Sequence, residues 1–236
     1  MLSARTGSIE IIMSIILNID TSLETASVSI ANNGIILQCL TNLIQKEHAS
    51  FLHGAINKLL QNSSIDISQL DAIAVTSGPG SYTGLRVGFA TAKGLCYALN
   101  KPFITIGTLN AMAFAAIHSN NDFEGTSAFF CAMIDARRME VYTGIFDKKM
   151  TEINPATAMI LEESSFEQIL QKNNVIFFGS GSVKWKKLNS SQNAIFIEEP
   201  DISSAFGKLS FEKFNLKNFT NLPYSSPLYV KDFFSP

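Results

Sequence analysis

The sequence predicts an α/β fold made of two similar domains. Its first half contains three strand-like runs, then a helix, a strand, a helix and a strand, and its second half repeats this order more weakly. Apolar residues make up 46% of the 236 residues, so each half has enough of them to build its own core.

Three short strands open the predicted first domain. A buried run over 14–19 ends in Asp20-Thr21-Ser22, and a run of alternating small polar and apolar residues covers 26–31. Asn32-Asn33-Gly34 supplies residues that tolerate a positive φ, and a third run covers 35–40. This pattern predicts a hairpin with a tight turn.

Two helices and two more strands complete the first half. Apolar residues spaced by four predict a helix over 48–61, and a short apolar strand covers 71–76. A glycine-rich turn then leads into a helix over 83–99, and a last strand covers 103–106. The order matches the ribonuclease-H-like unit, with a three-strand meander followed by parallel strands joined through helical crossovers.

The second half shows the same features in weaker form. A strand over 129–134 ends in Asp135, as the first strand ends in Asp20, and an alternating strand returns over 140–146. Residues 175–178 form another strand, which runs into a Gly-Ser-Gly-Ser turn and a short helix. The period of roughly 100–115 residues predicts two ribonuclease-H-like domains, the second eroded.

Composition narrows the classes of function. Charged residues make up only 16%, which fits either a compact chain or a surface partly reserved for another protein. The net charge of −2 does not favour a domain that binds nucleic acid alone. Three cysteines without a C-x-x-C pair indicate reduced thiols, a cytoplasmic protein and no structural zinc. No apolar run reaches the roughly 18 residues that would predict a membrane span.

The most specific motif is the loop from Ser77 to Gly84. Its glycines allow close backbone approach, and the N–H groups that begin the next helix can bind an anion. The loop lacks the lysine of a P-loop and the spacing of a G-x-G-x-x-G fingerprint. Two interpretations stay open, a tight turn that binds nothing and a phosphate loop. The residues of a nucleotide or phosphate loop would be Asp20, Ser77, Gly78, Gly80 and Ser81.

The aspartates and histidines give no clear catalytic set. In actin-like and hexokinase-like ATPases an aspartate placed like Asp20 or Asp135 helps to hold magnesium, but either residue could instead cap its own turn. His48 and His53 lie five residues apart on one predicted helix, about 140° around its axis, so they do not converge on a metal. We therefore predict neither a metal site nor catalytic residues.

The helix over 83–99 carries an unusual row of small residues. The row, spaced by four, is Gly84, Gly88, Ala92 and Cys96, and Gly94 and Ala98 begin a second row. Each glycine in a helix costs about 1 kcal/mol relative to alanine, which indicates that something packs closely against the row. The chain's own sheet could do so, but we favour the helix of a partner protein.

Four blocks of the sequence resemble TsaB (YeaZ) proteins. They are Ile16–Ser22 with the following strand, Ser77–Gly88, Ile134–Tyr142 and Pro227–Lys231. The resemblance covers nearly the whole chain from Met13. The twelve leading residues have no counterpart, and we expect them to form a disordered extension.

The resemblance implies a two-domain actin-like fold whose C-terminal segment returns to the first domain. We accordingly expect a first domain over 1–107 joined by 222–236, and a second domain over 108–221.

The resemblance also implies a function. Family members pair with the homologous catalytic subunit TsaD and, with the ATPase TsaE, help to transfer a threonylcarbamoyl group to N6 of the adenosine beside the tRNA anticodon. The chain would be a non-catalytic scaffold that meets tRNA only through the complex. It would need no cofactor beyond weakly bound ATP or ADP at the subunit boundary, and it could form a homodimer when alone.

In this family the two first-domain helices form the subunit contact, and these correspond to 48–60 and 83–99 here. The expected interface residues are His48, Phe51, Leu52, Ala55, Leu59, Tyr82, Thr83, Gly84, Arg86, Val87, Gly88 and Lys93.

Two other functions remain open. An independent ATP-dependent enzyme of the actin-like superfamily, such as a small kinase, would need two intact phosphate loops. A peptidase, as the family's frequent glycoprotease label suggests, would need metal ligands that the histidine spacing does not supply.

Overall fold

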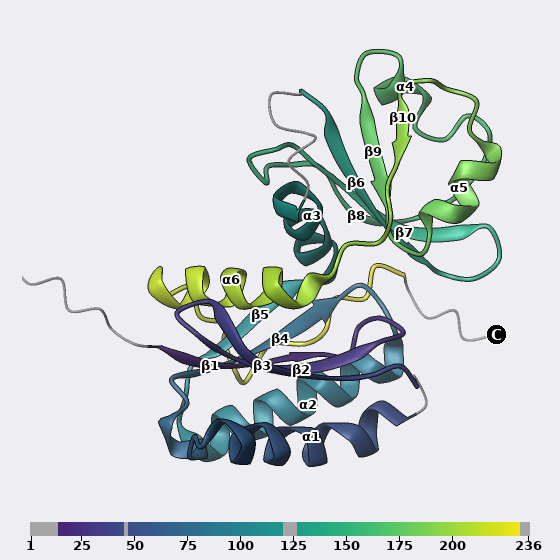
Figure 1. Ribbon diagram of the computed structural model, residues 1–236. Coiled ribbons are helices and arrows are strands. Elements are labelled where there is room, and N and C mark those ends of the chain that lie inside the picture. The colour runs from purple at the N-terminus through teal and green to yellow at the C-terminus, as the bar shows by residue number, and fades with distance from the viewer. Residues whose placement is uncertain (1–13, 45–46, 120–126, 232–236) are drawn as a thin grey trace, which may run out of the picture.

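A computed structural model describes residues 14–44, 47–119 and 127–231 of the chain. These residues form two five-stranded sheets, one in each half, with helices packed on their faces (Figure 1). The extension expected over residues 1–12 lies outside the described residues. None of the described helices combines the length and the apolar character that crossing a membrane requires.

The first sheet has the predicted strand order. Strands β1 (Ile15–Asp20), β2 (Ala26–Asn32) and β3 (Ile35–Asn42) form the antiparallel meander. Strands β4 (Ala72–Gly78) and β5 (Phe103–Gly107) extend the sheet in parallel on the other side of β1. The resulting order is β3-β2-β1-β4-β5.

Helices cover both faces of this sheet. Helices α1 (His48–Ser63) and α2 (Tyr82–Leu99) lie together on the face that points away from the second half (Figure 1). A short 3₁₀ turn, η2 (Ile67–Gln69), precedes β4. Helix α6 (Ile202–Asn215) lies on the opposite face, where it contacts β1, β2, β3 and β5. The chain therefore returns to the first sheet at Ile202, earlier than the residue 222 that we expected.

The second sheet repeats the first strand by strand. Its strands are β6 (Phe129–Asp135), β7 (Glu140–Phe146), β8 (Glu152–Ile160), β9 (Val175–Phe178) and β10 (Ala194–Phe196). The first three form a meander, β9 runs parallel to β6, and β10 runs parallel to β9. The order β10-β9-β6-β7-β8 confirms the predicted pair of ribonuclease-H-like units.

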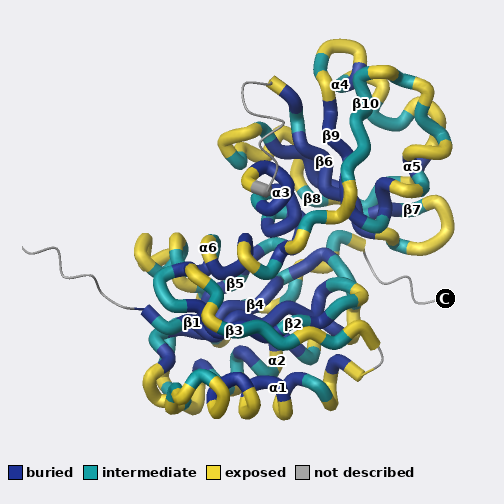
Figure 2. Tube along the Cα trace, in the orientation of Figure 1, coloured by how far each residue is buried: buried dark blue, intermediate teal, exposed yellow. Residues whose placement is uncertain are grey.

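The erosion of the second unit is visible in its helices. Helix α4 (Glu167–Leu170) has four residues and α5 (Ser182–Leu188) has seven, whereas α1 and α2, at the same points of the first unit, have 16 and 18. The two short helices cover much less of the second sheet. In Figure 2, exposed residues accordingly follow one another around α4 and α5.

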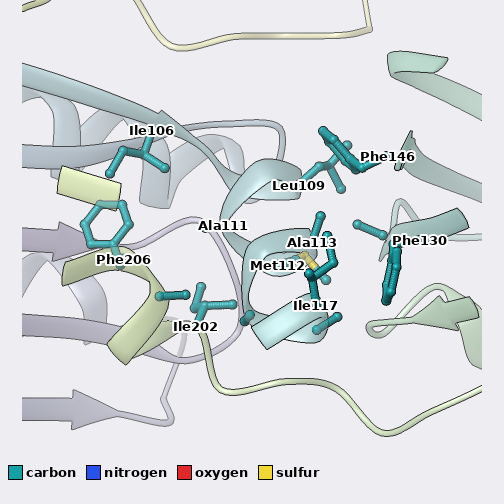
Figure 3. Packing of buried hydrophobic residues seen from close by; sticks show 14 of the residues in the cluster. Ile106, Leu109, Ala111, Met112, Ala113, Ile117, Phe130, Phe146, Ile202 and Phe206 are labelled. Carbon is teal, nitrogen blue, oxygen red and sulfur yellow. The ribbon is translucent and has the colours of Figure 1, made fainter. Parts of the chain in front are cut away.

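Helix α3 (Thr108–Ser119) joins the two halves through one shared core. Its side chains are apolar nearly all round, as expected for a helix buried on every side. In Figure 3, Leu109 and Met112 lie between first-half residues such as Ile106 and second-half residues such as Phe130, all in one buried cluster. The position of each sheet relative to the other therefore depends on this helix.

The small-residue row of α2 faces the chain's own sheet. Gly84, Gly88, Ala92 and Cys96 are all buried. A Cβ atom at Gly84 would overlap the carbonyl oxygen of Thr21, and one at Gly88 would overlap the Thr21 hydroxyl. The favoured interpretation of this row as an open partner surface is therefore wrong, because the close approach that glycine permits is made within the fold.

The structure predicts opposite effects for two glycine substitutions in α2. Gly88→Ala should lower the free energy of unfolding by about 1–3 kcal/mol, because overpacking against Thr21 outweighs the gain in helix propensity. Gly94→Ala should raise it by up to about 1 kcal/mol, since no atom lies within 4 Å of the added Cβ. Urea unfolding of both variants measures these changes.

A double-mutant cycle isolates the contact. In a Thr21→Ala background the cost of Gly88→Ala should shrink, because the next atom beyond the Thr21 hydroxyl lies 3.5 Å away, at ordinary contact distance. The cost of Gly84→Ala should persist there, since its overlap is with backbone. Equal stability of the Gly88→Ala and Gly94→Ala variants would contradict this account of the packing.

Candidate functional site

A cavity of about 950 Å³ lies between the two halves. Its lining comes from the turn between β1 and β2, the start of α1, the loop before α2, the turn between β6 and β7, and the segment that leads into α6. Asp20 and Asp135, the aspartates that end the equivalent strands β1 and β6, both line it. The structure therefore brings together the two aspartates that the sequence analysis paired.

Hydrogen bonds from neighbouring residues hold the carboxylate of Asp20 in place. One carboxylate oxygen accepts hydrogen bonds from the Ser22 N–H at 2.9 Å, the Ser22 hydroxyl at 2.7 Å and the Thr76 hydroxyl at 2.8 Å. Burial raises the pKa of Asp20 above its ordinary value, although these hydrogen bonds and the nearby His48 lower it in part. The bond to the Ser22 N–H is the turn cap that we considered as an alternative to a metal ligand.

The glycine-rich loop contacts the β1–β2 turn. The Ser81 N–H donates to the Ser22 carbonyl at 2.7 Å, and a side chain at Gly80 would overlap that same carbonyl. The Ser81 hydroxyl accepts from the Gly84 N–H at 3.3 Å and so caps α2. An N–H group that a phosphate would need is thus already bound within the chain.

The C-terminal segment occupies the other side of the loop. The Leu228 N–H donates to the Ser77 carbonyl at 2.7 Å, and the Leu228 carbonyl lies 2.6 Å from where a Cβ at Gly78 would stand. The rings of Tyr229 and Tyr82 meet with centroids 5.2 Å apart. Together with the Ser81 bond, these contacts favour the tight-turn interpretation of the loop over a phosphate loop.

Two lysines tie the same C-terminal segment to both halves of the molecule. Lys93 of α2 donates to the Ser225 carbonyl at 2.9 Å. Lys231 pairs with Glu140 at the start of β7, with 2.6 Å between the charged atoms. Sequence reasoning missed both contacts, because residues so far apart in the chain leave no spacing signal.

Asp135 has an internal cation as its partner. Its carboxylate lies 2.7 Å from the Lys184 ammonium and accepts the Arg137 N–H at 2.6 Å. Although partial burial opposes the change, these contacts lower the pKa of Asp135 overall. Lys184 of α5 is therefore paired with a carboxylate, whereas the nearby Lys186 and Lys187 are exposed.

Half of the expected interface residues are buried inside the fold. The buried ones are His48, Leu52, Ala55, Leu59, Gly84 and Gly88; Tyr82, Thr83 and Arg86 are exposed, and Phe51, Val87 and Lys93 are intermediate. The expectation was wrong for the buried six, because the i, i+4 rows that mark a helix face in the sequence are the rows packed on the sheet.

His48 lies at the edge of the cavity and is only 3% exposed. Its Nε2 is 3.1 Å from the Glu24 carbonyl oxygen, while Nδ1 has no partner among the described residues. His53, by contrast, is exposed. Within the described part of the chain, no three His, Cys, Asp or Glu side chains are grouped as metal ligands.

Substitutions at Asp20 test what its carboxylate contributes. Asp20→Ala should cost about 1–3 kcal/mol of stability, because three buried donors lose their acceptor. Asp20→Asn keeps an acceptor oxygen without the buried charge, so at pH 7 it should be at least as stable as the unmodified chain.

The advantage of Asp20→Asn should depend on pH. Since the folded pKa is raised, ionisation of Asp20 costs stability as pH rises above its ordinary value of 3.8. The advantage should therefore fade as pH falls towards that value. Urea unfolding between pH 4 and 7 measures the trend, and an Asn variant as unstable as the Ala variant would contradict it.

Comparison with known proteins agrees with this architecture. A solved structure from Pseudomonas aeruginosa, described as an uncharacterized protein with similarity to peptidase YEAZ, superposes with a TM-score of 0.76 at 24% identity. The superposition covers 93% of this chain and 100% of that one. This likeness shows a shared fold.

Curated sequences give the family. The tRNA threonylcarbamoyladenosine biosynthesis protein TsaB of Haemophilus influenzae is 38% identical over 127 residues, which are 54% of this chain and 51% of that protein. The protein of the same name from Escherichia coli is 29% identical over 184 residues, 76% of this chain and 77% of that protein. The family model TsaD, tRNA N6-adenosine threonylcarbamoyltransferase, matches residues 40–213. The chain therefore belongs to the family that the TsaD model describes and, within it, to the TsaB (YeaZ) proteins.

Proposed function

We propose that this chain is a non-catalytic subunit in the biosynthesis of threonylcarbamoyladenosine in tRNA. It pairs with a TsaD-type catalytic subunit and works with a TsaE-type ATPase. The catalytic subunit transfers the threonylcarbamoyl group to N6 of the adenosine beside the anticodon. The names of its relatives, which refer to this pathway, support the assignment.

The observation that carries the proposal is the outer surface of α1 and α2. Both helices lie on the face of the first sheet that points away from the second half (Figure 1). Ala90, Gly94 and Ala98 form an exposed row at i, i+4 spacing on α2, and Tyr97 beside it is 84% exposed. Gly54 on α1 is also exposed, and no atom lies within 4 Å of a Cβ added there or at Gly94.

A surface of this kind suits a helix from another protein. Small residues let a second helix approach closely, and an exposed tyrosine can supply the large apolar contact on which interface affinity often depends. The contact with the partner is thus assigned to the second row of small residues in α2, which is exposed, rather than to the first row, which is buried. The low fraction of charged residues in the chain fits a surface of this kind.

The contacts around the cavity favour a partner subunit over an independent ATP-dependent enzyme. The Ser81 N–H is bound to Ser22, the C-terminal segment covers Gly78, and Lys184 already neutralises Asp135. Phosphate groups would have to displace these internal contacts. A partner subunit accounts for the outer surface of α1 and α2 without requiring any such rearrangement.

Gly94→Arg tests the partner surface. Arginine is a better helix former than glycine and has open space at this position, so the variant should fold with unchanged or higher stability. It should nevertheless lose at least about tenfold in affinity for the TsaD-type subunit, because its side chain would block close helix packing. Calorimetric titration of the two purified subunits measures the loss.

Ser164→Arg is the matched control for this variant. It adds the same charge at an exposed position of the second half. Its affinity for the TsaD-type subunit should equal that of the unmodified chain. Unchanged pairing of a folded Gly94→Arg variant would count against the proposed interface.

Calorimetry of the isolated chain with Mg-ATP separates the proposal from the enzyme alternative. We expect weak or undetectable binding, with a Kd no tighter than about 1 mM, because the loop donors and Asp135 are already engaged. Micromolar binding together with ATP turnover by the chain alone would favour the independent enzyme.

A further inference from the structure

We propose that the partner subunit presents acidic side chains to the outer face of α1 and α2, and that Arg86 is their main contact. The outer face means here the exposed residues of these two helices. The proposal rests on the function proposed above, because it takes the same surface and adds the chemistry of the protein that binds there.

The outer face carries no carboxylate. Neither α1 nor α2 contains any of the 20 Asp and Glu residues of the chain. The acidic residues that flank α1 in the sequence, Glu47 and Asp66, lie beyond its two ends. Glutamate is a good helix former and pairs with lysine on exposed helices, so two long surface helices without it give up this stabilisation. The net charge of −2 therefore comes entirely from the rest of the chain.

The C-terminal segment beside α2 is also free of carboxylates. Residues 213–231 contain no Asp or Glu. The Lys93 ammonium donates to the carbonyl oxygens of Pro223 at 3.4 Å and Ser225 at 2.9 Å, which holds the segment against α2. The element next to α2 therefore supplies no anion that could neutralise the outer face.

Arg86 is the cation of this face that is best prepared for a carboxylate. It is exposed, and its guanidinium carbon lies 4.9 Å from the centroid of the Tyr82 ring. One guanidinium nitrogen donates to the Tyr82 hydroxyl at 2.9 Å. Neither of the ion pairs in the described chain involves Arg86. A guanidinium that is already held in place loses less entropy when it forms a two-pronged contact with a carboxylate.

The outer face fits an acidic helix better than a nucleic acid. Binding to nucleic acid depends on many contacts between cations and phosphates. With Lys93 bound to the C-terminal segment, α1 and α2 offer two exposed lysine or arginine side chains, Lys58 and Arg86. The exposed row through Gly94 also lets a second helix approach closely.

The salt dependence of association tests the charge of the partner. The association rate of the full-length chain with the TsaD-type subunit should fall at least about tenfold between about 0.05 and 0.5 M sodium chloride, because salt screens the attraction between opposite charges. Surface plasmon resonance measures this rate. An association rate that stays constant or rises with salt would overturn the inference.

Matched variants locate the attraction on the outer face. Lys58→Gln with Arg86→Gln should slow association about tenfold at low salt and leave little salt dependence. Lys172→Gln with Lys187→Gln removes the same charge from exposed positions of the second half and should leave the rate nearly unchanged. Urea unfolding checks that both double variants fold. Equal slowing in both would show a mere effect of net charge and overturn the inference.

Arg86→Lys separates the guanidinium group from its charge. This variant should keep most of the association rate, because the positive charge remains. It should dissociate severalfold faster, because an ammonium cannot make the two-pronged contact. An unchanged dissociation rate would contradict the role of Arg86.

The outcomes distinguish this inference from the proposed function. Binding to the TsaD-type subunit that is independent of salt would leave the proposed function intact and overturn only the acidic partner. A chain that does not bind this subunit at any salt concentration would contradict both. Binding of tRNA by the isolated chain, lost in the Lys58→Gln with Arg86→Gln variant, would assign the face to RNA and overturn the inference.

Discussion

The contact between the end of β1 and helix α2 is the constraint on which the rest of the structure depends. The Thr21 hydroxyl donates to the Gly84 carbonyl at 2.7 Å, and only glycine at 84 and 88 lets the helix come so close. This contact fixes the rotation of α2 about its own axis. One row of small residues is thereby turned inward, and the row through Gly94 is turned outward.

The same end of β1 also organises the cavity. Asp20 precedes Thr21, and Ser22 follows it with a carbonyl that accepts the Ser81 N–H. The turn, the glycine-rich loop and the start of α2 are thus one hydrogen-bonded unit. Leu228 adds the C-terminal segment to that unit through Ser77, and Lys231 extends the connection to Glu140 in the second half. A substitution at the partner surface and a substitution at the cavity would therefore both affect this hydrogen-bonded unit.

Much of the fold could be predicted from the sequence, because its strands end in clear local signals. The turn at Asn33 and Gly34 has the positive φ values, 49° and 80°, that the sequence indicates. Helix α6 was missed because Ser203, Ser204 and Gly207 weaken its helix propensity. Gly207 lies close to the first sheet, since a Cβ there would lie 2.7 Å from Cδ1 of Ile36 and 3.1 Å from the Gly34 carbonyl oxygen.

The candidate site could be predicted only in part. The spacing of small residues identified two rows on α2 but could not show which row faces inward. A helix needs small residues for close packing whether it packs on its own sheet or on the helix of a partner. Pairs such as Lys184 with Asp135 join residues 49 positions apart in the chain and have no local pattern.

Hydrogen exchange of the chain with and without a TsaD-type subunit tests the central claim most directly. If α2 is held by its inner glycine row and presents its outer row to a partner, complex formation should slow exchange in α1 and α2. Exchange in β6, β7 and β8 should stay unchanged. Protection confined to the second sheet, with α1 and α2 exchanging as in the free chain, would contradict the account.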